Sequence, residues 1–170
     1  MDIATQQKKA AGKFSEIGMP SVKEESWRFT DVSHIQFDDF HNKWTDSKLP
    51  YEPLSDLFIV FENGRISNEK SSFGSLPNGI KIHSIHDSQD ERIGSLADSE
   101  SGFVLHNTAN FDDGIFIDVD VNVSVEKPIH IIHLADSENG CFQYRHLFSL
   151  KENSRVSIVE EYIGSSDTLY

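Results

Sequence analysis

The sequence of 170 residues has one cysteine, few basic residues and no long apolar segment. The single cysteine, Cys141, excludes an internal disulfide and a zinc site built from several cysteines. No apolar run approaches the roughly 20 residues that a membrane-spanning helix needs. The 15 Lys and Arg residues stand against 28 Asp and Glu, and the net charge of −13 argues against a dedicated nucleic-acid-binding protein and against docking on anionic membranes.

The residues that are present indicate a folded, acidic protein. Twelve Phe and two Trp argue against disorder, and 37% apolar residues suffice for a hydrophobic core. Residues 86–170 hold 16 acidic and 5 basic side chains, so the acidic excess lies mostly in the second half. Residues 1–11 are polar and lack the apolar stretch of a secretory signal, and we therefore expect a cytoplasmic protein.

The first half of the chain predicts helices and a β-hairpin. Apolar residues recur with helical spacing over residues 2–17, and Gly18 is suited to end that helix. The apolar run Leu57–Phe61 is followed by Asn63 and Gly64, the pair most typical of a tight hairpin turn. Apolar spacing and capping-box motifs predict further helical segments at residues 21–27, 37–44, 88–97 and 102–110.

The second half predicts short strands without helices between them. Aliphatic residues alternate with mostly polar ones from Ile115 to Val125, which predicts one long strand with an apolar and a polar face. Other strands are predicted at residues 80–85, 129–134, 142–150 and 156–163. Many short strands at regular spacing are typical of a sandwich, a barrel or the coils of a β-helix, and the pattern alone does not choose among them.

The histidines offer no convincing metal site in the sequence. His130 and His133 resemble a chelating pair, but an odd separation on a strand places the two rings on opposite faces. His83 and His86 fail for the same reason. We therefore interpret the eight histidines as structural or surface residues.

The acidic residues offer no convincing catalytic pair either. Asp118 and Asp120 share a strand face at a spacing of about 6.5–7 Å, and paired carboxylates can cleave glycosidic bonds. The opposite face is the aliphatic one, so we expect the two carboxylates to be solvated. Glu160 and Glu161 are adjacent and point to opposite faces.

Cys141 could in principle act as a nucleophile or as an iron–sulfur ligand. Without a second cysteine or a clustered histidine, a small, half-buried filler is the better interpretation. No phosphate-binding loop, dinucleotide fingerprint, HExxH or GxSxG motif is present in the sequence. We therefore predict no catalytic, cofactor-binding or metal-binding residue.

Several segments form a recognisable set through their order and spacing: Gly18–Pro20 with Lys23–Asp31, Phe58–Arg65, Leu105–Ala109 with Asp113–Ile117, Lys127–His130, Arg145 with His146, and Val159–Tyr162. Together they resemble the SufB and SufD scaffold proteins of the Suf system for iron–sulfur cluster assembly. The resemblance spans most of residues 14–164, and the segment that forms the expected hairpin is more similar to SufD than to SufB.

The resemblance implies a mainly β protein with an N-terminal α/β part. It implies a helical domain with a β-hairpin at residues 1–100 and, at residues 101–170, the first coils of a right-handed parallel β-helix that is incomplete. The end of the chain, residues 165–170, leads toward another apolar segment, and we therefore expect a truncated chain. Trp27, Arg28, Pro128 and Arg145 match family motifs, and we expect them to act in packing and turns.

The resemblance also implies a function. The protein would be a non-enzymatic scaffold subunit of a SufBCD complex, acting with SufB and the SufC ATPase, or paired with itself as a homodimer. The positions that handle the cluster and contact these partners would lie beyond residue 170, so no cofactor is expected in this fragment, and neither nucleic acid nor a membrane is expected as a partner. Two alternatives stay open: a β-helix carbohydrate-active enzyme that uses Asp118 and Asp120, and a β-rich binding module.

Overall fold

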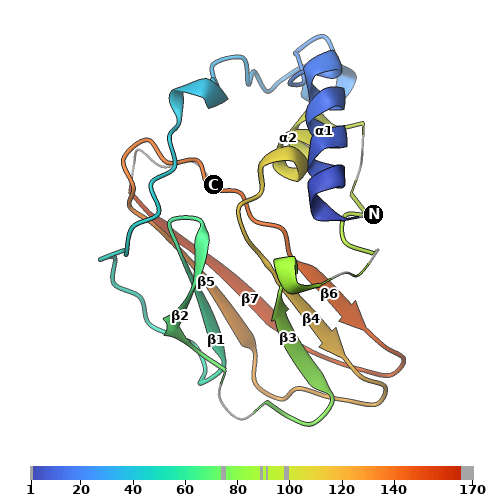
Figure 1. The fold of residues 1–170 in the computed structure, drawn as a ribbon, viewed down its shortest axis with the longest axis vertical. Helices are drawn as coiled ribbons and strands as arrows, with labels where there is room; N and C mark the ends of the chain where they lie inside the picture. The colour runs from blue at the N-terminus through green and yellow to red at the C-terminus, as the bar shows by residue number, and fades with distance from the viewer. Residues whose placement is uncertain (1, 74–75, 89, 91, 98–99, 166–170) are drawn as a thin grey trace. The chain divides into compact units, whose positions relative to one another are not determined.

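A computed structural model describes residues 2–73, 76–88, 90, 92–97 and 100–165, and the chain divides into two compact units (Figure 1). One unit combines Met1–Phe40 with Gln89–Phe111, and the other combines His41–Ser88 with Asp112–Tyr170. The sequence predicts two domains that are each continuous in the chain, 1–100 and 101–170. That division stays a prediction. Among the described residues, no helix has both the length and the apolar character to cross a membrane.

The first unit contains two α-helices where the sequence predicts them, α1 (Ile3–Ile17) and α2 (Gly102–Asn110). The Asp2 carboxylate caps α1 by accepting a hydrogen bond of 2.9 Å from the Thr5 N–H. Gly18 ends α1 with φ 68, a conformation that favours glycine. A Cβ at Gly102 would lie 2.3 Å from the Gly18 carbonyl oxygen, so this close approach of the two helix ends requires glycine.

Three other predicted helices are shorter than expected or wrong. Residues 21–27 form only the 3₁₀ turn η1 (Glu25–Trp27), and residues 37–44 form only η2 (Phe37–Asp39). The helix expected over residues 88–97 is wrong for the described residues, because 92–97 form turns and Gly94 has φ 77, which interrupts a helix. Glu91, which completes the capping box predicted there, lies outside the described residues.

The described part of the second unit contains two open sheets and the short 3₁₀ turn η3 (Ile85–Asp87). One sheet has the strand order β2-β1-β5-β7 and the other has the order β3-β4-β6. The strands are β1 (Phe58–Glu62), β2 (Arg65–Ser72), β3 (Ile80–Ser84), β4 (Ile115–Val119), β5 (Ile129–Ala135), β6 (Leu147–Leu150) and β7 (Ile158–Gly164).

The predicted hairpin is confirmed, and the pairing beyond it is largely parallel. β1 and β2 are antiparallel around Asn63 and Gly64, which have φ 44 and 95. β5 pairs in parallel with β1 and with β7, and β4 pairs in parallel with β6. From β4 to β7 the chain alternates between the two sheets, so that β6 lies parallel to β4 and β7 lies parallel to β5 (Figure 1).

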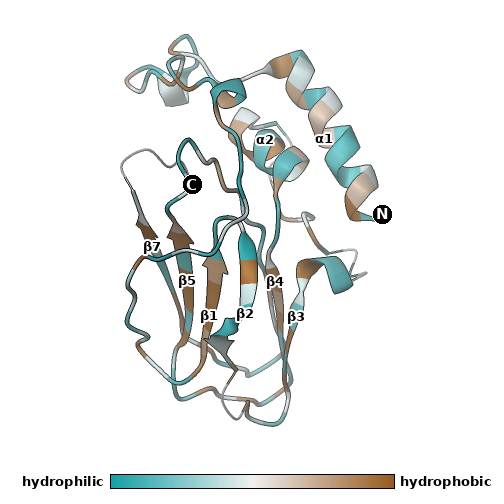
Figure 2. Ribbon diagram, turned by 60° about the vertical axis from the view of Figure 1, so that its left-hand side comes forward, coloured by the Kyte–Doolittle hydropathy of each residue, from teal (hydrophilic) through white to brown (hydrophobic). Residues whose placement is uncertain are grey.

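The core lies between the two sheets. It takes the alternate residues of β1, β4 and β5, and Figure 2 shows β1 and β5 as largely hydrophobic. A second apolar cluster lies on the other face of the larger sheet, where Leu49 and Tyr51 cover Val60, Ile132 and Leu134. β5 is consequently buried along its whole length.

Two predicted strands are too long. The strand expected over Ile115–Val125 ends at Val119, because the chain turns at residues 120–123 with Asn122 at φ 61. The strand expected over residues 142–150 is confined to β6, although Tyr144 still forms one parallel bridge with Asp113. The sequence predicts that residues 165–170 lead toward another apolar segment, but only Ser165 of these lies among the described residues.

Candidate metal centre

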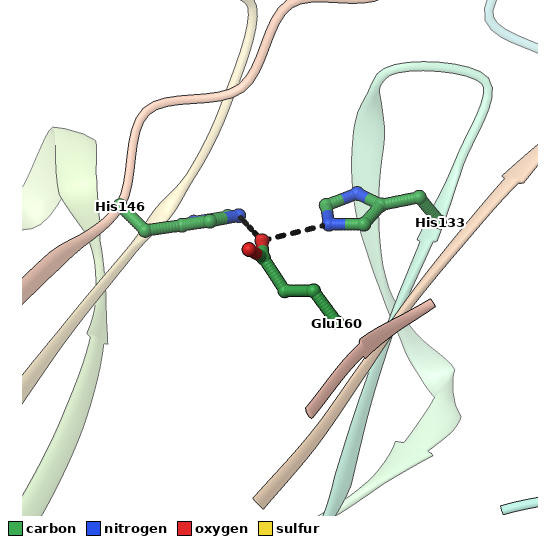
Figure 3. Close-up of side chains that lie close together, drawn as sticks. All are labelled: His133, His146 and Glu160. Atoms are coloured by element: carbon green, nitrogen blue, oxygen red, sulfur yellow. Dashed lines mark hydrogen bonds and ion pairs between the residues drawn. The ribbon is translucent and has the colours of Figure 1, made fainter. Parts of the chain in front are cut away.

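Three side chains from separate segments of the second unit converge on one point. His133 lies on β5, Glu160 on β7, and His146 just before β6 (Figure 3). The Nε2 atoms of both histidines lie 3.3 Å from the same oxygen, Oε1 of Glu160. The parallel register of β5 and β7 sets His133 opposite Tyr162, so Glu160 is the residue two positions earlier on the same face.

Aromatic rings surround the imidazole of His133, which is fully buried. Tyr162 stacks on it with ring centroids 4.4 Å apart, and the rings of Tyr144 and Phe61 lie at 4.2 and 5.1 Å. The side chain of Glu160 keeps 35% of its surface exposed, so the cluster reaches solvent along this side chain.

The carboxylate of Glu160 is ionised at neutral pH. The two imidazoles beside Glu160, first His133 and then His146, hold the pKa of its carboxyl group well below the usual range. Burial lowers the pKa of His133, so this imidazole stays neutral. A deprotonated carboxylate and a neutral imidazole are the forms of these groups that bind metal ions.

The neighbours of His146 define which of its nitrogens carries the proton. The Ile115 N–H donates a hydrogen bond of 3.1 Å to Nδ1 of His146, and a backbone N–H can only donate. The ring proton of the neutral imidazole therefore sits on Nε2. That Nε2 is buried and, despite its 3.3 Å distance from Glu160, lacks the alignment of a hydrogen bond.

A second histidine–glutamate pair lies on the opposite face of the same two strands. The Nε2 of His130 lies 3.2 Å from Oε2 of Glu161, and the Leu54 N–H donates to Nδ1 of His130 at 3.2 Å. Two predictions are thereby confirmed, because His130 and His133 face opposite sides of β5, and Glu160 and Glu161 face opposite sides of β7. This pair is not part of any three-residue cluster with metal-ligand spacing among the described residues.

The grouping of His133 with Glu160 and His146 is not visible among neighbouring positions of the sequence and was not predicted. The available signal was the strand spacing of about 30 residues, since paired positions such as Ile129 and Ile158 are 29 apart. A parallel register at that spacing brings Glu160 next to His133.

The other candidate residues do not form such a cluster. Asp118 and Asp120 share one cation, Lys151, whose Nζ lies 3.6 Å from Oδ2 of Asp118 and also pairs with Asp120. Asp120 is exposed at 43% as expected, whereas Asp118 keeps only 18%, so a fully solvated pair was the wrong expectation. His83 packs beside the ring of Phe116, 6.0 Å between centroids, and His86 contacts the Asp112 carbonyl oxygen at 2.9 Å.

Cys141 is buried beside Asp112 rather than half-buried. Burial raises the pKa of the Cys141 thiol to about 11, and it raises the pKa of the Asp112 carboxyl group to about 6. Asn42 joins the two residues, because its Nδ2 donates to Asp112 at 3.1 Å and its Oδ1 accepts from the Cys141 N–H at 2.8 Å. A thiol with so high a pKa is a poor nucleophile.

The residues that match family motifs lie in packing contacts and loops. Trp27 stacks on Phe103 with ring centroids 5.3 Å apart, and Arg28 lies over the ring of Phe29. The carbonyl oxygen of Pro128 accepts a hydrogen bond of 2.7 Å from the Ser55 hydroxyl. The carbonyl oxygen of Arg145 lies 1.8 Å from where a Cβ of Gly114 would be, so the two backbones are in close contact.

Comparisons with known proteins agree on one family. The family described as SufBD protein N-terminal region matches residues 2–131. A relative from Synechocystis sp., named as an iron–sulfur cluster assembly SufBD family protein, is 28% identical over 178 aligned positions that cover 94% of this chain. The alignment covers 39% of that relative, so the chain spans about two fifths of its length.

Proposed function

Because this chain belongs to the SufBD family, we propose that the protein acts in the assembly of iron–sulfur clusters. The observation that carries the proposal is the family match over residues 2–131, which takes in α1, the hairpin, α2 and the first parallel strands. The relative from Synechocystis, which is named for this process, aligns with nearly the whole chain.

The finer role that we propose is that of a SufD-type scaffold subunit in the cytoplasm, working with SufB and the SufC ATPase. The SufD-like hairpin segment, Phe58–Arg65, supports this assignment. A non-enzymatic role fits the pair Asp118 and Asp120, because Lys151 forms ion pairs with both carboxylates.

We also propose that the second unit begins a right-handed parallel β-helix. The alternation of the chain between two sheets from β4 to β7, with parallel pairing at separations of 29 and 31 residues, supports two successive coils. The strands β6 and β7 would then pair with the next coil of a longer chain. Secondary-structure pairing in a longer SufBD protein with this N-terminal region, determined by NMR or crystallography, tests this extension.

The test of the function uses the affinity-tagged protein expressed from its own gene. Purification under anaerobic conditions should retain SufB and SufC, identified by mass spectrometry, and deletion of the gene should lower the activity of iron–sulfur enzymes during iron limitation. A preparation that retains neither protein would refute the partners. Unchanged iron–sulfur enzyme activity in the deletion strain would refute the function.

A further inference from the structure

We propose that His133, His146 and Glu160 bind one divalent transition-metal ion of the type of zinc or ferrous iron. The site is a property of this chain that goes beyond the proposed role in cluster assembly and does not depend on it. Two imidazoles and one carboxylate form a ligand set that such ions accept, and three protein ligands leave further coordination positions for water.

The two nitrogen–oxygen distances in the cluster match the spacing of ligand atoms around a metal ion, and the contact between His133 and Glu160 also forms a long hydrogen bond in the metal-free protein. Metal–nitrogen and metal–oxygen bonds of about 2.0–2.1 Å in tetrahedral geometry put neighbouring ligand atoms about 3.3 Å apart. Both nitrogen–oxygen distances in the cluster are 3.3 Å. A charge-assisted hydrogen bond from an N–H to a carboxylate would be shorter, at about 2.7–2.9 Å.

Two buried nitrogens of the cluster have no hydrogen-bond partner. These atoms are Nε2 of His146 and Nδ1 of His133, and a buried polar nitrogen without a partner is costly. A metal ion between the two Nε2 atoms and Glu160 would occupy the direction in which Nε2 of His146 points (Figure 3). Its charge would also neutralise the ionised carboxylate of Glu160.

Metal uptake has a specific consequence for His146. Its Nε2 carries the ring proton in the metal-free protein, because Nδ1 accepts from the Ile115 N–H. When the lone pair of Nε2 bonds to the metal, that proton moves to Nδ1, which can then no longer accept a hydrogen bond. Metal binding therefore switches the tautomer of His146 and releases the Ile115 N–H, while the total number of protons on the ring is unchanged.

The site is accessible to an ion from solvent. The side chain of Glu160 is partly exposed, whereas His133 lies at the buried end of the cluster. The excess of acidic side chains in residues 86–170 raises the local concentration of cations.

The binding test uses the full chain after removal of metal with a chelator. Titration with Zn²⁺ by calorimetry and with Co²⁺ by visible absorption should show one equivalent bound, with the intense absorption of four- or five-coordinate cobalt. Glu160→Gln and His146→Gln should each weaken binding by about 100-fold or more, since even loss of an outer partner of a ligand costs about 10–100-fold.

The matched control is Glu161→Gln, which removes the same group from the same strand but on the opposite face. It should leave the affinity for both ions unchanged. The proposal would be overturned by an equal loss of metal affinity in this control or by unchanged affinity in Glu160→Gln. Weak binding of several ions to surface histidines would overturn it as well. Far-UV circular dichroism and thermal melting of the metal-free variants establish that each variant is folded.

A second measurement needs no variant. In the wild-type protein labelled with ¹⁵N-histidine, Zn²⁺ should move the protonated nitrogen of His146 from Nε2 to Nδ1, and hydrogen exchange of the Ile115 amide should accelerate. A spectrum in which the His146 tautomer and the Ile115 amide stay unchanged at saturating Zn²⁺ would contradict binding at this site.

Discussion

Asp112 destabilises the second unit at neutral pH, and its replacement by asparagine should stabilise the protein. Burial raises the pKa of this carboxyl group from 3.8 to about 6, so the folded protein resists its ionisation. Between these two pKa values the folded state binds more protons than the unfolded state, and stability therefore falls as the pH rises through this range. Asparagine has no proton to lose, so the variant lacks this fall.

The size of the effect follows from the shift. About two pKa units correspond to about 3 kcal/mol, because one unit is worth about 1.4 kcal/mol. Asp112 is only half-buried, and solvent screening reduces this figure to about 1 to 2 kcal/mol. The side-chain amide that Asp112→Asn introduces can still accept the hydrogen bond from Asn42, so little packing is lost.

The assay is urea unfolding followed by the fluorescence of Trp44, which lies in the second unit under the guanidinium of Arg65. A Trp27→Phe background removes the other tryptophan, which belongs to the first unit. Relative to wild type, Asp112→Asn should gain about 1 to 2 kcal/mol in unfolding free energy between pH 4 and pH 7.5.

The control is Asp56→Asn, which removes an exposed carboxylate paired with Lys127. The hydrogen bond from Lys127 lowers the pKa of Asp56, so its stabilising contribution is present above pH 3.8 and is lost at lower pH. The difference between variant and wild type should therefore have the opposite sign. A pH-independent difference for Asp112→Asn, or equal slopes for the two variants, would refute the reasoning.

Three further predictions concern single positions. Gly114→Ala should cost about 3 kcal/mol or more by calorimetry, because its Cβ would meet the Arg145 backbone at 1.8 Å, whereas Gly12→Ala meets nothing within 4 Å and should stabilise slightly. Asn63→Ala should lower the free energy of unfolding in urea by about 3 kcal/mol, because the backbone N–H groups of Asp136 and Ser137 lose their acceptor. Asn153→Ala should lower it much less, because Asn153 has a similar φ of 56 but is exposed. Cys141, with its thiol pKa raised to about 11, should react with Ellman's reagent at pH 8 only as fast as the protein unfolds, and rapid labelling of the folded protein would contradict its burial.

Local sequence signals located most elements but not their ends. Asn63 and Gly64 define the hairpin because both accept positive φ, and this requirement is local. The alternation from Ile115 to Val125 continues past the true end of β4, because β3 pairs only with Ile115–Val119 and supplies no partner beyond Val119. A partner strand that is distant in sequence therefore decides where the strand stops.

The candidate site could not be predicted from neighbouring residues. His133 and Glu160 are 27 positions apart, and only the parallel register of β5 and β7 brings them together. His146 joins them from the loop before β6, and β6 is a strand of the other sheet. The same strand geometry correctly placed His130 and His133 on opposite faces of β5, because that argument needed only the alternation of side chains along one strand.

The interleaving of the two units imposes an order on their formation during protein synthesis. The first unit has all its residues once Phe111 has been made, because its second segment is inserted within the sequence of the other unit. β1, by contrast, lies between β2 and β5, and β5 follows it by about 70 residues. The hairpin of β1 and β2 therefore keeps one edge of β1 unpaired until Ile129–Ala135 leave the ribosome, and during that interval this edge is open to pairing with a wrong strand.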